Sequence, residues 1–257
     1  MKKKKKIYQL IINLMNSWPA KYYFFHKGWI LRFTNGVTSR ANSVLPLNYY
    51  GNRRTLNRDI TIVEEAYKMY NLPAIFTMHD FHKPKYLRNE LISKNYREIS
   101  HTVALGGRLN DINIENLNKN YKYFFLEMRH GDFSEFLSRQ SQKSEEEQNI
   151  INKITQRIKI LKKCFLVVKS QSSIVGTLAG VLDLNGYLYL VDIFVDPNFR
   201  KQSIAKSMFF KIMHDWVNPR NIKMVWLQVE IENETAISLY ENIGLKKLYN
   251  YYYLINS

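Results

Sequence analysis

The sequence is short of cysteine and of long apolar runs, and each shortage excludes a class of protein. Its single cysteine, Cys164, excludes an internal disulfide framework and indicates a reducing compartment. Cys164 lies in the apolar run CFLVV, so we expect a buried structural thiol rather than a nucleophile. No apolar stretch is long enough to span a bilayer. We therefore expect a cytoplasmic protein without a transmembrane segment.

Metal ligands are scarce as well. His79 and His82 lie three residues apart, a spacing that suits a metal only if the segment is helical. No cysteine or third histidine accompanies them, so we expect no metal site.

Aromatic residues and positive charge are abundant instead. Aromatic residues make up 14% of the 257 residues, and 46% of the residues are hydrophobic, enough for one large core or two modest ones. The net charge is +16, and residues 1–110 carry 19 Lys and Arg against six Asp and Glu. Such a balance indicates an acidic partner or a general bias in composition. Because the basic residues are scattered, we favour the bias and do not expect nucleic acid as a partner.

The first 15 residues, MKKKKKIYQLIINLM, imitate a secretory signal peptide. Their apolar part is short and interrupted by Gln9 and Asn13, and no small-residue cleavage site follows. We expect a basic arm leading into an amphipathic helix, with contact to anionic lipid or nucleic acid as the lesser alternative.

The first half of the chain begins with a hairpin signal. Asn35-Gly36 between apolar runs predicts a strand over 29–33 that returns over 38–47. Periodicity and turn residues then predict a helix over about 60–71, a strand over 74–78, a helix over about 86–95 and a strand over about 97–105. The polar, Asn-rich segment 108–120 is interpreted as a linker, which divides the chain into domains 1–110 and 111–257.

The second half predicts a mixed α/β sheet. Ser144 with Glu147 predicts a capping box, and Gly244 marks a helix C-terminus. Strands over 188–195 and 224–230 are expected to be neighbours joined by a crossover helix. The remaining expected elements are a strand over 121–128, helices over 133–139 and 144–161, strands over 165–169 and 174–184, helices over 203–216 and 233–243, and a strand over 245–254.

The stretch from Tyr187 to Ala205 points to an anion site. Its apolar strand runs through Asp196-Pro197 into a basic turn, and a helix opens at Ser203. Backbone N–H groups at such a helix start point outward and bind anions such as a pyrophosphate.

Residues 121–257 contain two motifs, IFVDPNFRKQSIAKSMF and LQVEIENETAISLYENIGL. Both resemble motifs of the GCN5-related N-acetyltransferase (GNAT) superfamily. In IFVDPNFRKQSIAKSMF, residues 200–205 fill the family's phosphate loop, which reads Arg or Gln, two variable residues, Gly, one variable residue, then Gly or Ala. The second motif is LQVEIENETAISLYENIGL. Its matching residues are Asn233, Ala236, Leu239, Tyr240, Gly244 and Leu245. Each motif alone is weak, but both together, in this order of elements, are fairly specific.

The resemblance implies a mostly antiparallel, twisted GNAT sheet flanked by helices, and an acetyl-coenzyme A-dependent transfer of an acetyl group to a primary amine. The strand 193–195 would pair with the pantetheine arm and polarise the thioester, and the loop would hold the pyrophosphate. The expected cofactor-binding residues are Ile193, Phe194, Val195, Arg200, Lys201, Gln202, Ser203, Ile204, Ala205, Lys206 and Asn233. Asn233 is expected to be a helix cap in any case.

Tyr240 is the residue that the resemblance nominates as general acid for the departing thiolate. The alternative is one more core aromatic among 18 tyrosines. Gln228 stands where many family members have a glutamate base, and Ser203 stands at a family glycine. Glu230, on the same strand face as Gln228, is the candidate base; Glu232 through water, or no base at all, remains open.

The first half resembles the degenerate N-terminal half of tandem-type GNAT proteins. In the register of LRNELISKNYREIS against AISLYENIGLKKLY, Leu91 falls at the place of Tyr240. An inactive half that shapes the substrate cleft is the expectation. Arg40, Asn42 and Ser43 either line that cleft or brace the hairpin.

Two other functions stay open at this point. One is a non-catalytic acyl-coenzyme A sensor, with Ser203 and Gln228 as marks of decay. The other is a basic nucleic-acid-binding protein that acts through residues 1–110. The acceptor, a small-molecule or protein amine, and the oligomeric state are not predicted.

Overall fold

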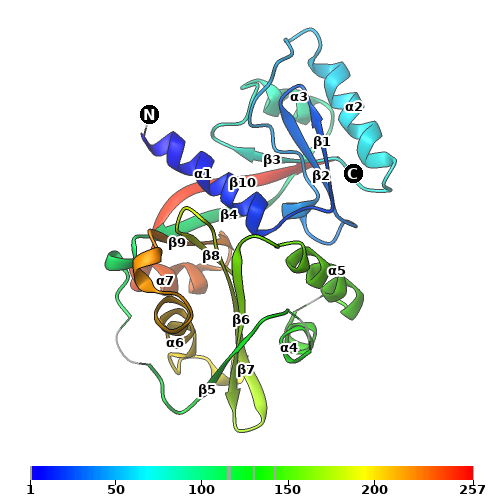
Figure 1. Cartoon of the computed structure of the whole chain (residues 1–257). Helices are drawn as coiled ribbons and strands as arrows, with labels where there is room; N and C mark the ends of the chain where they lie inside the picture. The colour runs from blue at the N-terminus through cyan, green and yellow to red at the C-terminus, as the bar shows by residue number, and fades with distance from the viewer. Residues whose placement is uncertain (1, 115–116, 130, 142, 257) are drawn as a thin grey trace.

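A computed structural model describes residues 2–114, 117–129, 131–141 and 143–256. Eight strands form one central sheet, flanked by helices (Figure 1). In chain order they are β3 Ile75–His79, β4 Arg97–Gly107, β5 Lys122–Leu126, β6 Lys162–Ser170, β7 Ser173–Leu182, β8 Tyr187–Val195, β9 Met224–Glu230 and β10 Lys246–Ile255. Across the sheet their order is β3-β10-β4-β9-β8-β7-β6-β5. Every neighbouring pair is antiparallel except β8 and β9, which confirms the expected mixed, mostly antiparallel sheet.

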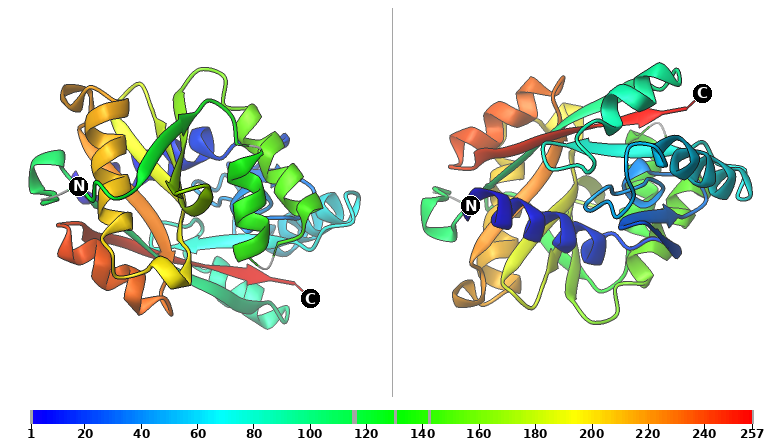
Figure 2. Two further views of the ribbon diagram at one scale, coloured as in Figure 1. Left: turned by 90° about the horizontal axis from the view of Figure 1, so that it is seen from below. Right: turned by 90° about the horizontal axis from the view of Figure 1, so that it is seen from above.

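The helices cover both faces of this sheet (Figure 2). They are α1 Lys2–Ser17, α2 Leu56–Lys68, α3 Leu87–Ser93, α4 Asp132–Gln140, α5 Glu145–Gln156, α6 Ile204–Lys211 and α7 Glu234–Asn242. Helices α1, α4 and α5 share one apolar cluster with the sheet, and α6 and α7 share another. We call these the α1 face and the α7 face of the sheet.

Helix α1 confirms the expected amphipathic helix. Ile7, Leu10, Ile11 and Leu14 are buried, at the spacing of one helix face. Asn13, which interrupts the apolar run in the sequence, is buried as well: it donates to Asp183 Oδ2 over 2.8 Å and accepts from Trp226 Nε1 over 2.8 Å. These bonds fix α1 across the sheet face.

The predicted hairpin about Asn35-Gly36 is wrong. Strand β2, Trp29–Phe33, pairs instead with the preceding β1, Tyr22–His26. The segment 38–47 holds a short 3₁₀ turn and two isolated bridges. The chain does turn at Asn35-Gly36, where both residues have positive φ. However, Asn42 Oδ1 accepts from the N–H groups of Thr34 and Gly36. The turn is therefore closed by a side chain and not by the backbone hydrogen bonds of a β-hairpin.

Local signals in the second half are confirmed. Ser144 and Glu147 form both bonds of the capping box. Gly244 has φ of 100°, a conformation that favours glycine. The helix predicted over 144–161 is shorter, because α5 ends at Gln156 and β6 already begins at Lys162.

The sheet is continuous across residue 110. Strand β4, from the first half of the chain, lies between β9 and β10, and β10 lies between β4 and β3 (Figure 1). Each half of the chain therefore places its last strand beside a strand of the other half.

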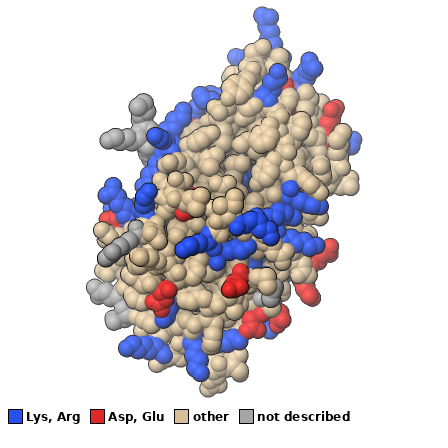
Figure 3. Space-filling model, in the orientation of Figure 1, with Lys and Arg blue, Asp and Glu red and all other residues tan. Residues whose placement is uncertain are grey.

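Lys and Arg are less evenly spread than the sequence indicated. They form a band across the middle of the face shown in Figure 3 and lie singly above and below it, while Asp and Glu lie mainly toward its lower part, where Figure 1 places α4 to α7. No helix among the described residues has the length and the hydropathy to cross a membrane.

Candidate active site

Strands β8 and β9 separate part of the way along their length. They pair over four positions, and the last pair is Leu190 with Leu227. Beyond it, β8 stays with β7 and β9 stays with β4. The backbone of 191–195 and the backbone of 228–230 therefore diverge, and their facing polar groups are left for a ligand. An extended, amide-containing ligand can add to such an edge as a strand does.

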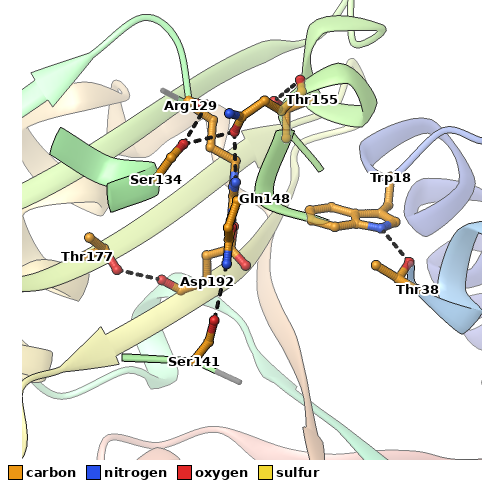
Figure 4. A network of polar contacts seen from close by, with 10 residues as sticks. Trp18, Thr38, Arg129, Ser134, Ser141, Gln148, Thr155, Thr177 and Asp192 are labelled. Atoms are coloured by element: carbon orange, nitrogen blue, oxygen red, sulfur yellow. Dashed lines mark hydrogen bonds and ion pairs between the residues drawn. The ribbon is translucent and has the colours of Figure 1, made fainter. Parts of the chain in front are cut away.

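A β-bulge lies where the strands part. Asp192 has φ of 53°, and the β7–β8 register shifts between Thr177 and Ala179. Arg129, which is 3% exposed, donates from Nε to Asp192 Oδ2 over 2.7 Å and from Nη2 to Gln148 Oε1 over 2.8 Å (Figure 4). Bulges of this kind bend a strand beside functional sites. Neither Arg129 nor Asp192 is predictable from the sequence, because no local pattern marks a long-range ion pair.

The loop after β8 ends in a left-handed turn. Lys201 and Ser203 have φ of 61° and 58°, and α6 begins at Ile204. Ser207 N–H donates to Ser203 O, but the N–H groups of 201–206 have no acceptor among the described residues. Lys201 and Ser203 are exposed. Unpaired amides at a helix N-terminus make a site for an anion.

Other residues of this loop hold its shape. Asn118 Nδ2 donates to Gln202 O over 2.8 Å, and Tyr121 donates to Gln202 Oε1. Ile204 is buried, and Ala205 and Lys206 are partly buried. Arg200 lies over the Phe194 ring and donates from Nε to Val195 O at 3.4 Å.

Tyr240 lies on the α7 face. Its side chain packs on Phe209 with ring centroids 5.7 Å apart, and the residue is 6% exposed. Its hydroxyl makes no hydrogen bond with the described residues, and burial raises the pKa of Tyr240. Ile193 and Val195 belong to the same apolar cluster. The phenol is therefore held protonated on the side of the sheet that β8 shares with α6 and α7.

Gln228 and Glu230 lie at the diverging end of β9. Gln228 Oε1 accepts from the Tyr189 hydroxyl at 3.4 Å, on the α1 face. Glu230 is exposed, and its carboxylate has no partner among the described residues. Asn233 caps α7 by accepting from Ala236 N–H over 3.1 Å, which confirms the expected cap.

A narrow pocket opens on the α1 face beside Gln228. Its lining includes polar residues that sequence reasoning assigned to no site, Arg32 and His79, together with Arg40. The other lining residues are Ile11, Leu14, Leu45, Thr77, Tyr249, Tyr251 and Tyr253. Of the two roles weighed for Arg40, Asn42 and Ser43, Arg40 lines a pocket, whereas Asn42 and Ser43 brace the turn and Arg32.

No three His, Cys, Asp or Glu residues gather as a potential metal site in the described part of the chain. His79 and His82 lie at the end of β3, and His82 Nδ1 is 2.7 Å from the His79 carbonyl oxygen. Cys164 is buried, and burial raises the pKa of its thiol, as expected for a structural cysteine.

Known proteins are similar to the region that contains the candidate site and to nearly the whole chain. Residues 125–245 match the sequence model of the acetyltransferase (GNAT) family. An uncharacterized N-acetyltransferase of Bacillus subtilis, YobR, is 25% identical over 243 residues, which are 93% of this chain and 94% of that protein.

Solved structures share the fold at low identity. A GCN5-related N-acetyltransferase from Kribbella flavida superimposes with a TM-score of 0.70 at 8% identity, over 96% of this chain and 94% of that one. A tandem GNAT protein from the clavulanic acid biosynthesis pathway gives a TM-score of 0.63 at 8% identity, over 83% of this chain and 74% of that one. The family match is thus limited to residues 125–245, which contain the candidate site, and the solved structures show that the whole chain shares their fold.

Proposed function

We propose that this protein transfers the acetyl group of acetyl-coenzyme A to a primary amine by direct attack. The observation that carries the proposal is the parting of β8 from β9 after Leu190 and Leu227, next to the unpaired amides of the loop 201–206. An extended ligand with a pyrophosphate at one end fits this combination.

The loop would hold the pyrophosphate. The N–H groups of residues 201–206 supply donors, and Lys201 and Lys206 supply positive charge. Ile193, Phe194 and Val195 would pair with the pantetheine arm. The Arg200 side chain would give up its hydrogen bond to Val195 O and donate to a phosphate instead. The Gln202 side chain accepts from Tyr121, Ile204 is buried, and Asn233 caps α7. These three residues would therefore contribute to cofactor binding through their backbone or through packing.

Tyr240 is the proposed general acid. As the amine nitrogen bonds to the acetyl carbon, the carbon–sulfur bond breaks and the sulfur takes the phenol proton. A phenol that burial keeps protonated suits this role. The amine loses one proton, for which Glu230 is the proposed acceptor; Gln228 has no basic group to offer.

The first half is proposed to be a degenerate GNAT-like unit, residues 1–110, that precedes the catalytic unit, residues 111–257. The topology supports a tandem origin, because β3–α3–β4 and β9–α7–β10 repeat the same order of elements. Their last strands are exchanged: β10 pairs with β3, and β4 pairs with β9, each antiparallel. Leu91, the counterpart of Tyr240, is fully buried in α3 and has no proton to give.

Release of free thiol from acetyl-coenzyme A over a panel of primary amines tests the proposal. We expect thiol release that depends on both the protein and an amine, with the acetylated amine identified by mass. Thiol release at the protein-free rate with every amine would overturn it.

A further inference from the structure

The pocket on the α1 face contains a buried cation without a counter-ion. Arg32 is 1% exposed. Its Nε donates to Ser43 O over 2.9 Å and its Nη2 to Ser43 Oγ over 2.6 Å, but its Nη1 is buried and has no partner among the residues that the structure describes. No Asp or Glu of the described residues pairs with Arg32 or with Arg40. Burying a charge is costly unless an opposite charge or hydrogen bonds compensate it.

His79 adds a second donor to the same pocket. Its Nδ1 accepts from Phe81 N–H over 3.1 Å, so the proton of the neutral ring lies on Nε2. That Nε2 is buried and has no acceptor within the described part of the chain. The same is true of Gln228 Nε2, which is a third buried donor. Three buried donors, each from a different strand, thus line the same pocket, and a single acceptor group placed there would serve all three.

The pocket adjoins the proposed reaction site. Gln228 is the first residue of β9 beyond the last β8–β9 pair, so the pocket begins where the strands part. Ile11 and Leu14 of α1 and the rings of Tyr249, Tyr251 and Tyr253 form its apolar walls. A small anion in such surroundings interacts strongly with a guanidinium, because little water screens the pair.

We propose that this pocket binds a carboxylate of the acceptor, so that the acceptor is an amine that also carries a carboxylate, such as an amino acid or a short peptide. A carboxylate has two acceptor oxygens in one plane, which suits an arginine with a second donor beside it. The inference rests on the proposed acetyl transfer, with Arg32 and His79 as specificity-determining residues of that reaction.

Matched acceptor pairs test the chemistry. Glycine, β-alanine, γ-aminobutyrate and glycylglycine are each compared with their carboxamides at saturating acetyl-coenzyme A. We expect kcat/KM to be at least about ten-fold higher for the carboxylate member of the preferred pair, because a buried donor set rejects a ligand that leaves it unpaired. Equal kcat/KM within every pair would overturn the proposal, and so would a preference for 2-aminoethylphosphonate over all four carboxylates.

Variants of the pocket test whether its buried donors cause the preference for a carboxylate. Arg32→Met should reduce the carboxylate preference to about one while leaving the acetyl-coenzyme A affinity unchanged. Arg157→Met is the matched control, because Arg157 Nη1 is also buried without a partner but lies outside this pocket. Should Arg32→Met not fold, His79→Leu provides the same comparison. A preference retained in the folded Arg32 or His79 variant contradicts the assignment.

Binding without turnover separates this inference from the proposed function. In the absence of acetyl-coenzyme A, millimolar amino carboxylates should raise the midpoint of thermal unfolding of the wild type more than their carboxamides do. If no amine is acetylated but this difference is seen and Arg32→Met abolishes it, the anion site stands and the acetyl transfer fails. If neither acetylation nor a difference is seen, both fail.

Discussion

Arg129 Nε lies 2.7 Å from Asp192 Oδ2, and this ion pair joins the segment after β5 to the bulge at which β8 turns away from β9. The guanidinium also donates to Gln148 and to Asn152 of α5, each over 2.8 Å. A residue with φ of 53° in the middle of a strand is strained unless its surroundings hold it. Arg129 therefore fixes the geometry of the opening that the proposed cofactor occupies.

Arg129→Met should destabilise the protein by about 3 kcal/mol, because it leaves Asp192 without its charge partner and Gln148 Oε1 without a donor, while Asn152 Oδ1 keeps only Ser134. Denaturant unfolding at neutral pH measures this. Lys169→Met is the control, since the Lys169–Asp132 pair is largely exposed and such pairs contribute about 0–1 kcal/mol. If the two variants lost the same stability, Arg129 would not be the residue that holds the bulge.

Ser203→Gly should stabilise the protein by about 1 kcal/mol, since Ser203 holds a left-handed conformation that costs a residue with a β-carbon about 1–2 kcal/mol. It should not weaken the binding of acetyl-coenzyme A, because the donors in question are backbone groups. Thermal unfolding and calorimetric titration measure the two effects. Ser173→Gly, at an exposed strand position without positive φ, should destabilise instead. A loss of stability in Ser203→Gly would contradict the left-handed turn.

Tyr240→Phe removes only the hydroxyl and keeps the ring on Phe209. We expect an unchanged dissociation constant for acetyl-coenzyme A and a kcat lower by about 10²–10⁴-fold, the range of a lost general acid. Steady-state kinetics and calorimetry measure these quantities. Tyr187→Phe, which loses one hydrogen bond to Gln9 at an exposed site, should leave both unchanged. Full turnover by Tyr240→Phe would remove Tyr240 from the mechanism.

His79 makes the stability depend on pH. Burial, and then the nearby His82 and Lys85, lower the pKa of His79 to about 4. An unfolded histidine titrates near pH 6.5, so between about pH 6.5 and 4 the unfolded chain binds a proton that the folded chain does not. Stability therefore falls as the pH drops through this window, by about 3 kcal/mol in all at about 1.4 kcal/mol per pH unit.

His79→Asn should flatten that slope, since an asparagine oxygen can still accept from Phe81 N–H and does not titrate. Urea unfolding at pH 7, 6 and 5 measures the difference. His82 shifts in the same direction, chiefly through burial, so part of the slope remains. The same slope in His79→Asn and in the wild type would show that His79 is protonated in the folded protein.

The elements that the sequence predicted well are those with local signals. The cap at Asn233 and the stop at Gly244 follow from residue type alone. The strand Tyr22–His26 escaped prediction because the residues YYFFH are exposed or half-exposed on both faces, and so show no alternation. The exchange of β4 and β10 depends on pairing between distant segments, which leaves no mark within either segment.

One part of the candidate site was predictable from the sequence and the other part was not. The loop 200–206 lies within one stretch of sequence, so its position after a strand and before a helix was predictable. The pocket was not, because Arg32, His79 and Gln228 come from three strands and are brought together only by the order β3-β10-β4-β9 and by the packing of β2. An arginine in a strand pattern such as WILRF looks like a solvent-facing residue until the structure shows both of its sides covered.

Binding of acetyl-coenzyme A tests the central claim most directly. Unfolding of the wild-type protein is followed with and without acetyl-coenzyme A at 100 times its dissociation constant, which calorimetric titration supplies. We predict a gain in the free energy of unfolding of about 2.7 kcal/mol. If calorimetry detects no binding and the unfolding transition does not move at millimolar acetyl-coenzyme A, the opening between β8 and β9 is not a cofactor site and the proposed function is wrong.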